Sequence, residues 1–278
     1  MIYPELKYYR AKDSRNLATR YWGTKEPIAD VIFLHGIVSH GGWYEASSSS
    51  LAGDGFAVHF LERRGSGLNL EGSGDVDHWT TWVSDVVTYL ELLPADRPKI
   101  LAGISWGGIL ATCIARQHPE LLNGLVLICP GLFSNKAANR VQRTALSLAK
   151  RIGLLNKKVQ VPLQDPALFT NSPSWKNFIQ QDQLAIRQIT IRFAVNNLDL
   201  IGQATRHPEQ IKTPVMLALA TTDPITANEP TRDFVQRFGS TQREIIEYEG
   251  ASHTLEFEDA PSAYFHDLSN WCRGLAKT

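Results

Sequence analysis

The chain has 278 residues, of which 43% are hydrophobic and 20% are charged, as in ordinary globular proteins. Its 28 basic residues balance its 28 acidic residues, so the overall charge does not indicate binding to nucleic acid or to another strongly charged partner. The length allows either one large domain or two small domains and does not separate them; we expect one domain with an insertion.

The cysteines and the amino terminus indicate a reducing compartment. Cys113, Cys129 and Cys272 have neither CxxC nor Cys/His spacing, so we expect buried free thiols and no disulfide framework or zinc site. Residues 1–16 carry charges where a secretory signal needs an apolar stretch. The most apolar segment, residues 99–115, is interrupted by three glycines and a serine and is too short to span a bilayer. We therefore expect a soluble, cytoplasmic protein.

Short aliphatic or β-branched runs recur along the chain and predict strands. Most of these runs lack alternation of apolar and polar residues, which is typical of strands buried on both faces of a parallel sheet. They cover residues 30–35, 56–61, 99–104, 124–129, 214–220 and 243–248.

Helical patterns separate the predicted strands. Between residues 75 and 93, apolar residues recur at spacings of three and four, with Asp75 placed to cap the helix and Pro94 to end it. Further helices are predicted after Ser105 and over 260–275. This alternation predicts an α/β fold with a mostly parallel, doubly wound sheet.

The alternation stops between the fourth and fifth predicted strands. Residues 131–212 contain helical stretches and a proline-spaced piece but no clear strand, so we interpret them as an inserted helical cap. The core domain then comprises residues 1–130 and 213–278.

The stretch LAGISWGGIL, residues 101–110, places Ser105 in a G-x-S-x-G sequence between a predicted strand and a predicted helix. In this arrangement a nucleophile lies on a strained turn at the carboxyl edge of the sheet, and small residues on either side let the backbone pass closely. A serine hydroxyl also needs an adjacent base, which in turn needs a carboxylate.

Asp223 and His253 fit these two requirements in the expected chain order. Each follows directly after a predicted strand, at the edge of the sheet where Ser105 is expected. The oxyanion of the reaction needs two backbone N–H donors. We assign these to Trp106, the residue after the nucleophile, and to Ile37 in the loop after the first predicted strand.

These segments resemble the α/β-hydrolases of the monoacylglycerol lipase and lysophospholipase type, which are also grouped with serine aminopeptidases. The resemblance runs through residues 35–44, 62–69, 103–108, 221–225 and 250–258. It implies an α/β-hydrolase fold, with Ser105, Asp223 and His253 as the catalytic triad. It also implies that the amides of Ile37 and Trp106 form the oxyanion hole.

Glu62 and Asn69 depart from the family pattern D-x-R-G-x-G-x-S in the loop after the second predicted strand. Glu62, Arg63 and Arg64 either fix this loop or form a clamp for a substrate carboxylate; the first interpretation is favoured.

The predicted cap carries a basic amphipathic helix. Between residues 134 and 164 there are seven basic residues and no acidic residue, while Val141, Ala145, Leu148, Ile152 and Leu155 follow helical spacing. This apolar stripe either packs over the catalytic domain or meets an anionic lipid surface.

The combined evidence predicts a serine hydrolase of carboxylic esters with an apolar acyl chain, such as a monoacylglycerol or lysophospholipid. No metal or cofactor is expected. Two alternatives remain open. An amidase or aminopeptidase would need a cap carboxylate, for which Asp165, Asp182 and Asp199 are candidates; a receptor on the same fold would use the site only for binding. We expect a cap lining from Leu132, Phe133, Leu163, Phe169, Trp175, Phe178 and Phe193.

Overall fold

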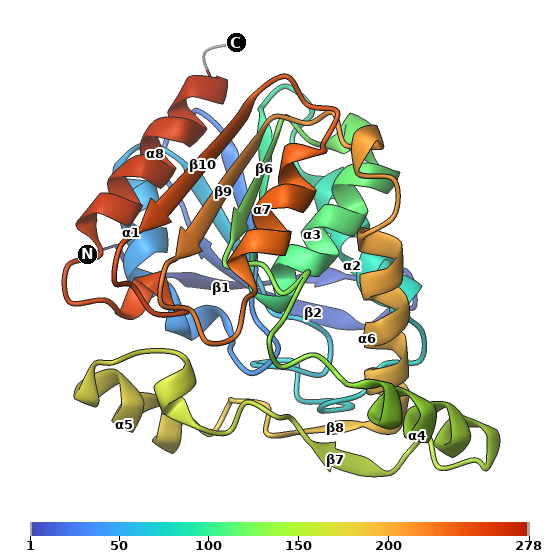
Figure 1. Ribbon diagram of the computed structural model, residues 1–278. Coiled ribbons are helices and arrows are strands. Elements are labelled where there is room, and N and C mark those ends of the chain that lie inside the picture. Colours follow the sequence, from blue (N-terminus) through green and yellow to red (C-terminus); the bar gives the residue numbers. More distant parts are fainter. Residues whose placement is uncertain (1, 277–278) are drawn as a thin grey trace.

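The six predicted strands are all present and lie in one eight-stranded sheet of the computed structural model, which describes residues 2–276 (Figure 1). The strand order is β1-β2-β4-β3-β5-β6-β9-β10. All pairs from β4 to β10 are parallel, whereas β2 runs antiparallel to both β1 and β4. The strands are β1 (Glu5–Arg10), β2 (Asn16–Trp22), β3 (Asp30–Leu34), β4 (Ala57–Leu61), β5 (Lys99–Ile104), β6 (Gly124–Ile128), β9 (Val215–Ala220) and β10 (Arg243–Tyr248).

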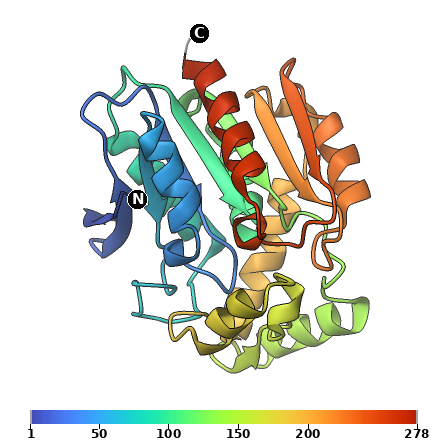
Figure 2. The same cartoon turned by 90° about the vertical axis from the view of Figure 1, so that its left-hand side faces the viewer.

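Helices cover both faces of the sheet. On one face lie α1 (Glu45–Gly53) and α8 (Ser262–Ala276), and on the other lie α2 (Trp79–Leu92), α3 (Trp106–Gln117) and α7 (Asn228–Gln236), as Figures 1 and 2 show. Burial between these layers explains why most residues of β3, β4, β6 and β9 are apolar, and every position of these four strands is buried. The mostly parallel sheet with helices on both faces is the α/β-hydrolase fold.

Short 3-10 turns connect several elements. They are η1 (Gly41–Trp43), η2 (Pro119–Leu121), η3 (Pro166–Leu168), η4 (Pro208–Gln210) and η5 (Leu255–Phe257).

The start of α2 differs from the prediction. The helix begins at Trp79, and the His78 side chain accepts the Thr80 N–H, so the assignment of Asp75 as the cap was wrong. Asp75 instead accepts the Thr190 hydroxyl and pairs with Arg192. Asp75 therefore bonds to Arg192 of the segment between β6 and β9 instead of capping α2. This partner is distant in sequence, so the residues around Asp75 do not predict the contact.

The segment between β6 and β9, which the sequence predicts to be the helical cap, lies at the carboxyl ends of the parallel strands, below the sheet in Figure 1. Its helices are α4 (Arg140–Arg151), α5 (Pro173–Gln181) and α6 (Ile191–Ala204). The expectation of a cap without strands was wrong, because β7 (Lys158–Gln160) and β8 (Gln188–Thr190) form an antiparallel pair. Three-residue strands are too short to show a periodic pattern, so only their pairing reveals them.

Hydrogen bonds join the cap to loops of the core at several points. The Ile186 N–H donates to the Val38 carbonyl at 3.0 Å, and the Thr254 N–H donates to the Phe169 carbonyl at 2.9 Å. In addition, Asp182 accepts hydrogen bonds from the side chains of Trp43 and His40. The cap is therefore fixed to the loops that follow β3 and β10.

The turn between β5 and α3 depends on glycines that bring the helix against the sheet. A Cβ atom at Gly107 would overlap the backbone carbonyl of Leu34 at the end of β3, and one at Gly103 would lie 2.5 Å from the Gly107 carbonyl oxygen. Backbone atoms cannot move aside as the end of a flexible side chain can, so these positions exclude larger residues.

We expect Gly107→Ala to lower the free energy of unfolding by about 3 kcal/mol, because the added methyl group must push α3 away from β3. Urea and thermal unfolding of the purified variant measure this change. Gly202→Ala is the matched control, since a Cβ there meets open space within α6 and should raise stability by up to about 1 kcal/mol. A Gly107→Ala protein as stable as the wild type would contradict the packing argument.

Candidate active site

Ser105 lies on the turn between β5 and α3 in a strained backbone conformation. Its φ of 51° and ψ of −115° are unusual for a residue with a side chain, and such a conformation costs on the order of 1–3 kcal/mol. The Ser105 N–H donates to the Ile128 carbonyl at 2.9 Å, which ties the turn to the end of β6. The surrounding packing therefore holds the Ser105 side chain at the carboxyl edge of the sheet.

Ser105, His253 and Asp223 form a chain of hydrogen bonds at this edge. The His253 Nε2 lies 2.9 Å from the Ser105 Oγ, and its Nδ1 lies 2.7 Å from Asp223 Oδ2. The carboxylate accepts the Nδ1 proton, so Nε2 is left free to accept the serine hydroxyl proton. All three residues are buried. The structure thus brings together the three residues that the sequence singled out.

Asp223 is held in its charged form. Burial raises the pKa of this carboxyl, but the opposing charge and hydrogen bond of His253 outweigh burial and keep the pKa below its usual value. The amides of Ile225 and Thr226 also donate to Asp223 Oδ1, at 2.7 and 3.0 Å. The carboxylate can therefore orient the imidazole and stabilise its protonated form.

Two backbone amides lie beside Ser105 without a protein acceptor. Within residues 2–276, neither the Ile37 N–H nor the Trp106 N–H donates to another group of the chain. Trp106 is the first residue of α3, where backbone donors have no partner in the helix. Ile37 lines the same small cavity as Ser105. Both amides are thus available to an oxygen bound near the serine.

A cavity of about 10 Å³ separates Ser105 from the cap, which is enough space for about one water molecule. Its lining is mostly apolar and includes two of the cap residues expected there, Leu163 and Phe169. The other predicted lining residues pack elsewhere. Trp175 stacks on Phe257 with ring centroids 4.1 Å apart, and Phe193 packs against Trp82. The full lining is Gly36, Ile37, Val38, Ser39, Tyr44, Ser105, Leu163, Phe169, His253 and Thr254.

Cys129 lies next to the Asp223 and His253 side chains. Ligand atoms of these three residues are within 4.8 Å of one another, so this group is the part of the described chain best placed to hold a metal ion. The aspartate and histidine atoms are already engaged in their mutual hydrogen bond, and burial raises the pKa of the Cys129 thiol. A metal ion there would compete with the hydrogen-bonded chain to Ser105.

The charged loop after β4 is held in place by ion pairs with other parts of the protein. Glu62 pairs with Arg20 at 2.9 Å, and Arg64 pairs with Asp13 and Asp85 at 2.6 and 2.7 Å. Both departures from the family pattern serve this loop, since the Asn69 side chain donates to the Glu62 carbonyl. These ion pairs support the loop-fixing interpretation for Glu62 and Arg64.

Two buried groups near the site escaped the sequence analysis. The His40 side chain lies 3.1 Å from Asp182, so one of the cap carboxylates considered for binding an amine already has a hydrogen-bond partner. Glu256, three residues after His253, accepts the Ser47 N–H at the start of α1. Neither pairing follows from local sequence, because each partner is more than 100 residues away.

The fold and the site define an α/β-hydrolase with a serine, histidine and aspartate at the carboxyl edge of its sheet. The chain belongs to the serine aminopeptidase S33 family, whose model matches residues 25–260. A human monoglyceride lipase is 24% identical over 276 residues, covering 97% of this chain and 90% of that protein. An abhydrolase domain-containing protein of Dictyostelium discoideum is 26% identical over 94% of this chain, which spans only 28% of that protein.

A solved structure supports the fold. The crystal structure of Paleococcus ferrophilus monoacylglycerol lipase matches with a TM-score of 0.81 and 24% identity, covering 95% of this chain and 99% of that chain.

The buried carboxyl of Glu256 gives a prediction about stability and pH. Burial raises its pKa from 4.5 to about 7, and its second oxygen lacks a hydrogen-bond partner among the described residues. The folded protein therefore binds this proton more tightly than the unfolded chain does. As pH rises from about 4.5 to 7, the unfolded chain loses this proton before the folded protein does. The contribution of Glu256 to the free energy of unfolding therefore falls over this range.

Accordingly, Glu256→Gln should match the wild type near pH 4.5 and exceed its free energy of unfolding by about 3 kcal/mol at pH 8. Urea unfolding at both pH values tests this. Glu249→Gln, which changes an exposed carboxylate nearby, should follow the wild type at both. Equal stability of the Glu256→Gln and wild-type proteins at pH 8 would show that folding does not raise the pKa of Glu256.

Proposed function

We propose that the protein hydrolyses carboxylic esters with an apolar acyl chain, such as monoacylglycerols, through an acyl-enzyme intermediate. The observation that carries this proposal is the hydrogen-bonded chain of Ser105, His253 and Asp223 beside an apolar cavity. The relatives named as monoglyceride lipases, aligned along most of their length, support the substrate class.

In the first half of the reaction, the Ser105 Oγ attacks the ester carbonyl carbon while His253 Nε2 removes the proton of the Ser105 hydroxyl. The carbonyl oxygen becomes an oxyanion, which the amides of Ile37 and Trp106 stabilise. Asp223 stabilises the imidazolium. His253 then gives its proton to the leaving alcohol oxygen as the ester C–O bond breaks, which leaves an acyl group on Ser105.

In the second half, His253 takes a proton from a water molecule, whose oxygen attacks the acyl carbon. A second oxyanion forms at the same two amides. As it collapses, the bond to Ser105 breaks and His253 returns the proton to the serine oxygen, so the products are a carboxylic acid and the free enzyme.

The surroundings of the cavity favour esters over aminoacyl substrates. An aminopeptidase needs a carboxylate that can bind the substrate amine. Asp182 is already bonded to His40 and Trp43, while Asp165 and Asp199 are exposed at the surface. Apart from the site histidine and serine, the described residues around the cavity present apolar side chains or uncharged hydroxyls. This lining suits an acyl chain.

Ser105→Ala should lower turnover of p-nitrophenyl esters on the order of 10⁶-fold, because the three residues act as a unit. A fluorophosphonate probe should label the wild type at Ser105 and leave the variant unlabelled. Ser147→Ala, on the exposed helix α4, is the control and should keep full activity. Turnover that rises with acyl chain length supports the proposed substrate class.

Other outcomes distinguish the alternatives. Turnover only of aminoacyl amides would favour the aminopeptidase, and binding of lipid without labelling would favour a receptor. A Ser105→Ala protein with more than one percent of wild-type activity would refute the assigned nucleophile.

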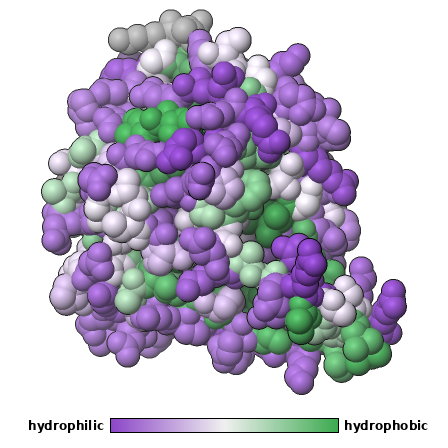
Figure 3. All heavy atoms as spheres, viewed as in Figure 1, coloured by the Kyte–Doolittle hydropathy of each residue, from purple (hydrophilic) through white to green (hydrophobic). Residues whose placement is uncertain are grey.

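We also propose that residues 131–212 form the cap and that the cap contacts an anionic lipid surface through α4. None of the residues of α4 is buried, contrary to a stripe packed on the catalytic domain. Val141, Leu148 and Ile152 are 78%, 57% and 61% exposed on one side of the helix, next to cations such as Arg151, which follows Leu148 by three residues. Figure 3 shows hydrophobic residues gathered at the lower right, where Figure 1 places α4, bordered by hydrophilic ones. Apolar residues flanked by cations suit the boundary between headgroups and acyl chains.

Contact of this kind is peripheral. Within residues 2–276 there is no helix with the length and apolar character needed to cross a bilayer.

We expect the protein to sediment with vesicles containing phosphatidylserine and to bind pure phosphatidylcholine vesicles more weakly. Leu148→Asp and the pair Lys150→Glu with Arg151→Glu should each lower the bound fraction several-fold, the second mainly at low salt. The pair Arg10→Glu with Lys12→Glu changes the same number of exposed cations near β1 and should leave binding unchanged. Wild-type protein that stays in the supernatant at low salt would remove this proposal.

A further inference from the structure

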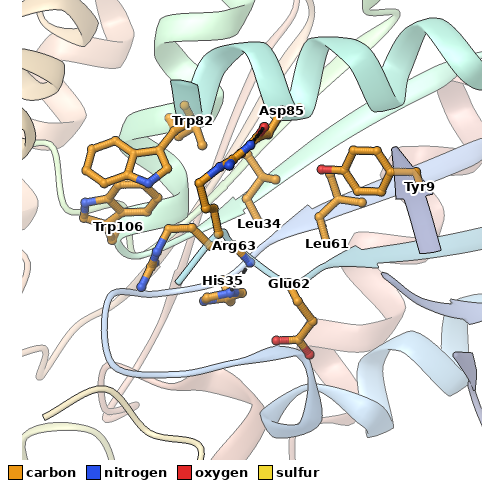
Figure 4. A pocket seen from close by; sticks show the side chains of 12 residues that line it. Tyr9, Leu34, His35, Leu61, Glu62, Arg63, Trp82, Asp85 and Trp106 are labelled. Carbon is orange, nitrogen blue, oxygen red and sulfur yellow. Dashed lines mark hydrogen bonds and ion pairs between the residues drawn. The ribbon is translucent and has the colours of Figure 1, made fainter. Parts of the chain in front are cut away.

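Arg63 is a buried cation without an ionic partner among residues 2–276. Its side chain lies beside the cavity of about 20 Å³ in Figure 4, and no carboxylate among the described residues pairs with it. Its neighbours differ, since Glu62 pairs with Arg20 and Arg64 pairs with two aspartates. Burial lowers the pKa of Arg63 to about 9. Placing an unpaired charge in the interior is unfavourable by several kcal/mol, so its hydrogen bonds need an explanation.

The guanidinium binds the loop that follows β3. Its Nη1 donates to the Gly36 carbonyl at 3.0 Å, and its Nη2 donates to the Ile37 carbonyl at 2.8 Å. The same Nη2 lies 3.3 Å from the Ser66 hydroxyl. Arg63 therefore uses its charge to hold two consecutive peptide groups of this loop.

One of these peptide groups contains a proposed oxyanion donor. The Gly36 carbonyl and the Ile37 N–H belong to the same planar unit, so a bond accepted by the carbonyl both orients and polarises the N–H. A second donor, His35 Nδ1, lies 2.8 Å from the same oxygen, and His35 Nε2 accepts the Arg63 backbone N–H at 3.0 Å. The Gly36 carbonyl thus receives two hydrogen bonds.

Arg63 also touches the residue that supplies the other donor. The guanidinium carbon lies 4.5 Å from the centre of the Trp106 ring, and the two side chains face each other in Figure 4. Asn197 on α6 accepts the Trp106 indole N–H at 2.8 Å and fixes that ring from the cap. A single cation therefore contacts both of the residues that are proposed to supply the oxyanion donors.

We propose that Arg63 is a positioning residue for the oxyanion hole. It holds the Ile37 peptide with its N–H directed at the site, and its positive charge stabilises the oxyanion through that peptide across a low-dielectric interior. This inference rests on the proposed function. Removing a single oxyanion donor typically costs 10²–10³ in turnover, so loss of its support should cost about 10²-fold.

Kinetics and two inhibitors of equal chain length test the proposal. In Arg63→Gln, kcat for a p-nitrophenyl ester should fall about 10²-fold with KM changed by less than about three-fold. Affinity for an alkyl trifluoromethyl ketone, which forms an oxyanion on Ser105, should fall by a similar factor. Affinity for a non-hydrolysable alkyl ether of glycerol, which forms none, should stay unchanged. Arg63→Lys keeps the charge but cannot bind both carbonyls, and should recover only part of the loss.

Arg64→Gln is the matched control, because Arg64 is an equally buried arginine of the same loop that bonds only to aspartates. It should lower the melting temperature and leave the ratio of ketone to ether affinity as in the wild type. Equal loss of both affinities in the Arg63 variants, or a change confined to melting temperature, would overturn the positioning role.

If the Arg63 variants do not fold, Ser66→Ala, which removes one acceptor of the guanidinium, should show a smaller selective loss of ketone affinity, and no selective loss overturns the proposal. The proposed function itself would be overturned if the wild-type protein hydrolysed no ester and bound the ketone no more tightly than the ether. That result is visible without any variant.

Discussion

Helix α3 approaches β3 so closely that Gly107 faces the Leu34 carbonyl with no room for a side chain. The chain must therefore reverse within one residue after β5, which forces Ser105 into positive φ and leaves the Trp106 amide unpaired at the start of the helix. Every other part of the site is supplied by a loop that follows a parallel strand and so ends at the same edge of the sheet. The cost of the strained serine, on the order of 1–3 kcal/mol, is small beside the burial of the surrounding core.

The interior near this turn holds its charges in two different ways. Arg64 and Arg20 are neutralised by carboxylates and mainly connect strands and loops. Arg63 is satisfied only by neutral oxygens, an arrangement that destabilises the fold relative to an apolar residue of similar shape. Proteins retain unfavourable groups of this kind where they act on a reacting centre. Of these two adjacent arginines, Arg64 stabilises the fold, whereas the proposed role of Arg63 is to position the site.

Much of this architecture could be predicted from the sequence, because it depends on local patterns. Aliphatic runs located the six parallel strands, and the order of Ser105, Asp223 and His253 behind three of them indicated residues that the structure places within hydrogen-bond distance. The outer strands β1 and β2 contain mixed polar residues, and β7 and β8 are very short, so neither pair gives a periodic signal. Asp75 pairs with a residue that is distant in sequence, and Arg63 donates to backbone carbonyls. The local sequence predicts neither kind of contact.

The neutral total charge conceals an uneven distribution. Seven of the 28 basic residues lie between positions 134 and 164, where no acidic residue occurs, so the rest of the chain has 21 basic residues against 28 acidic ones. The molecule is therefore an electric dipole with its positive end at α4 and its negative end in the catalytic body. An electric field exerts a torque on such a dipole, so the field of an anionic surface would turn α4 toward that surface at a distance.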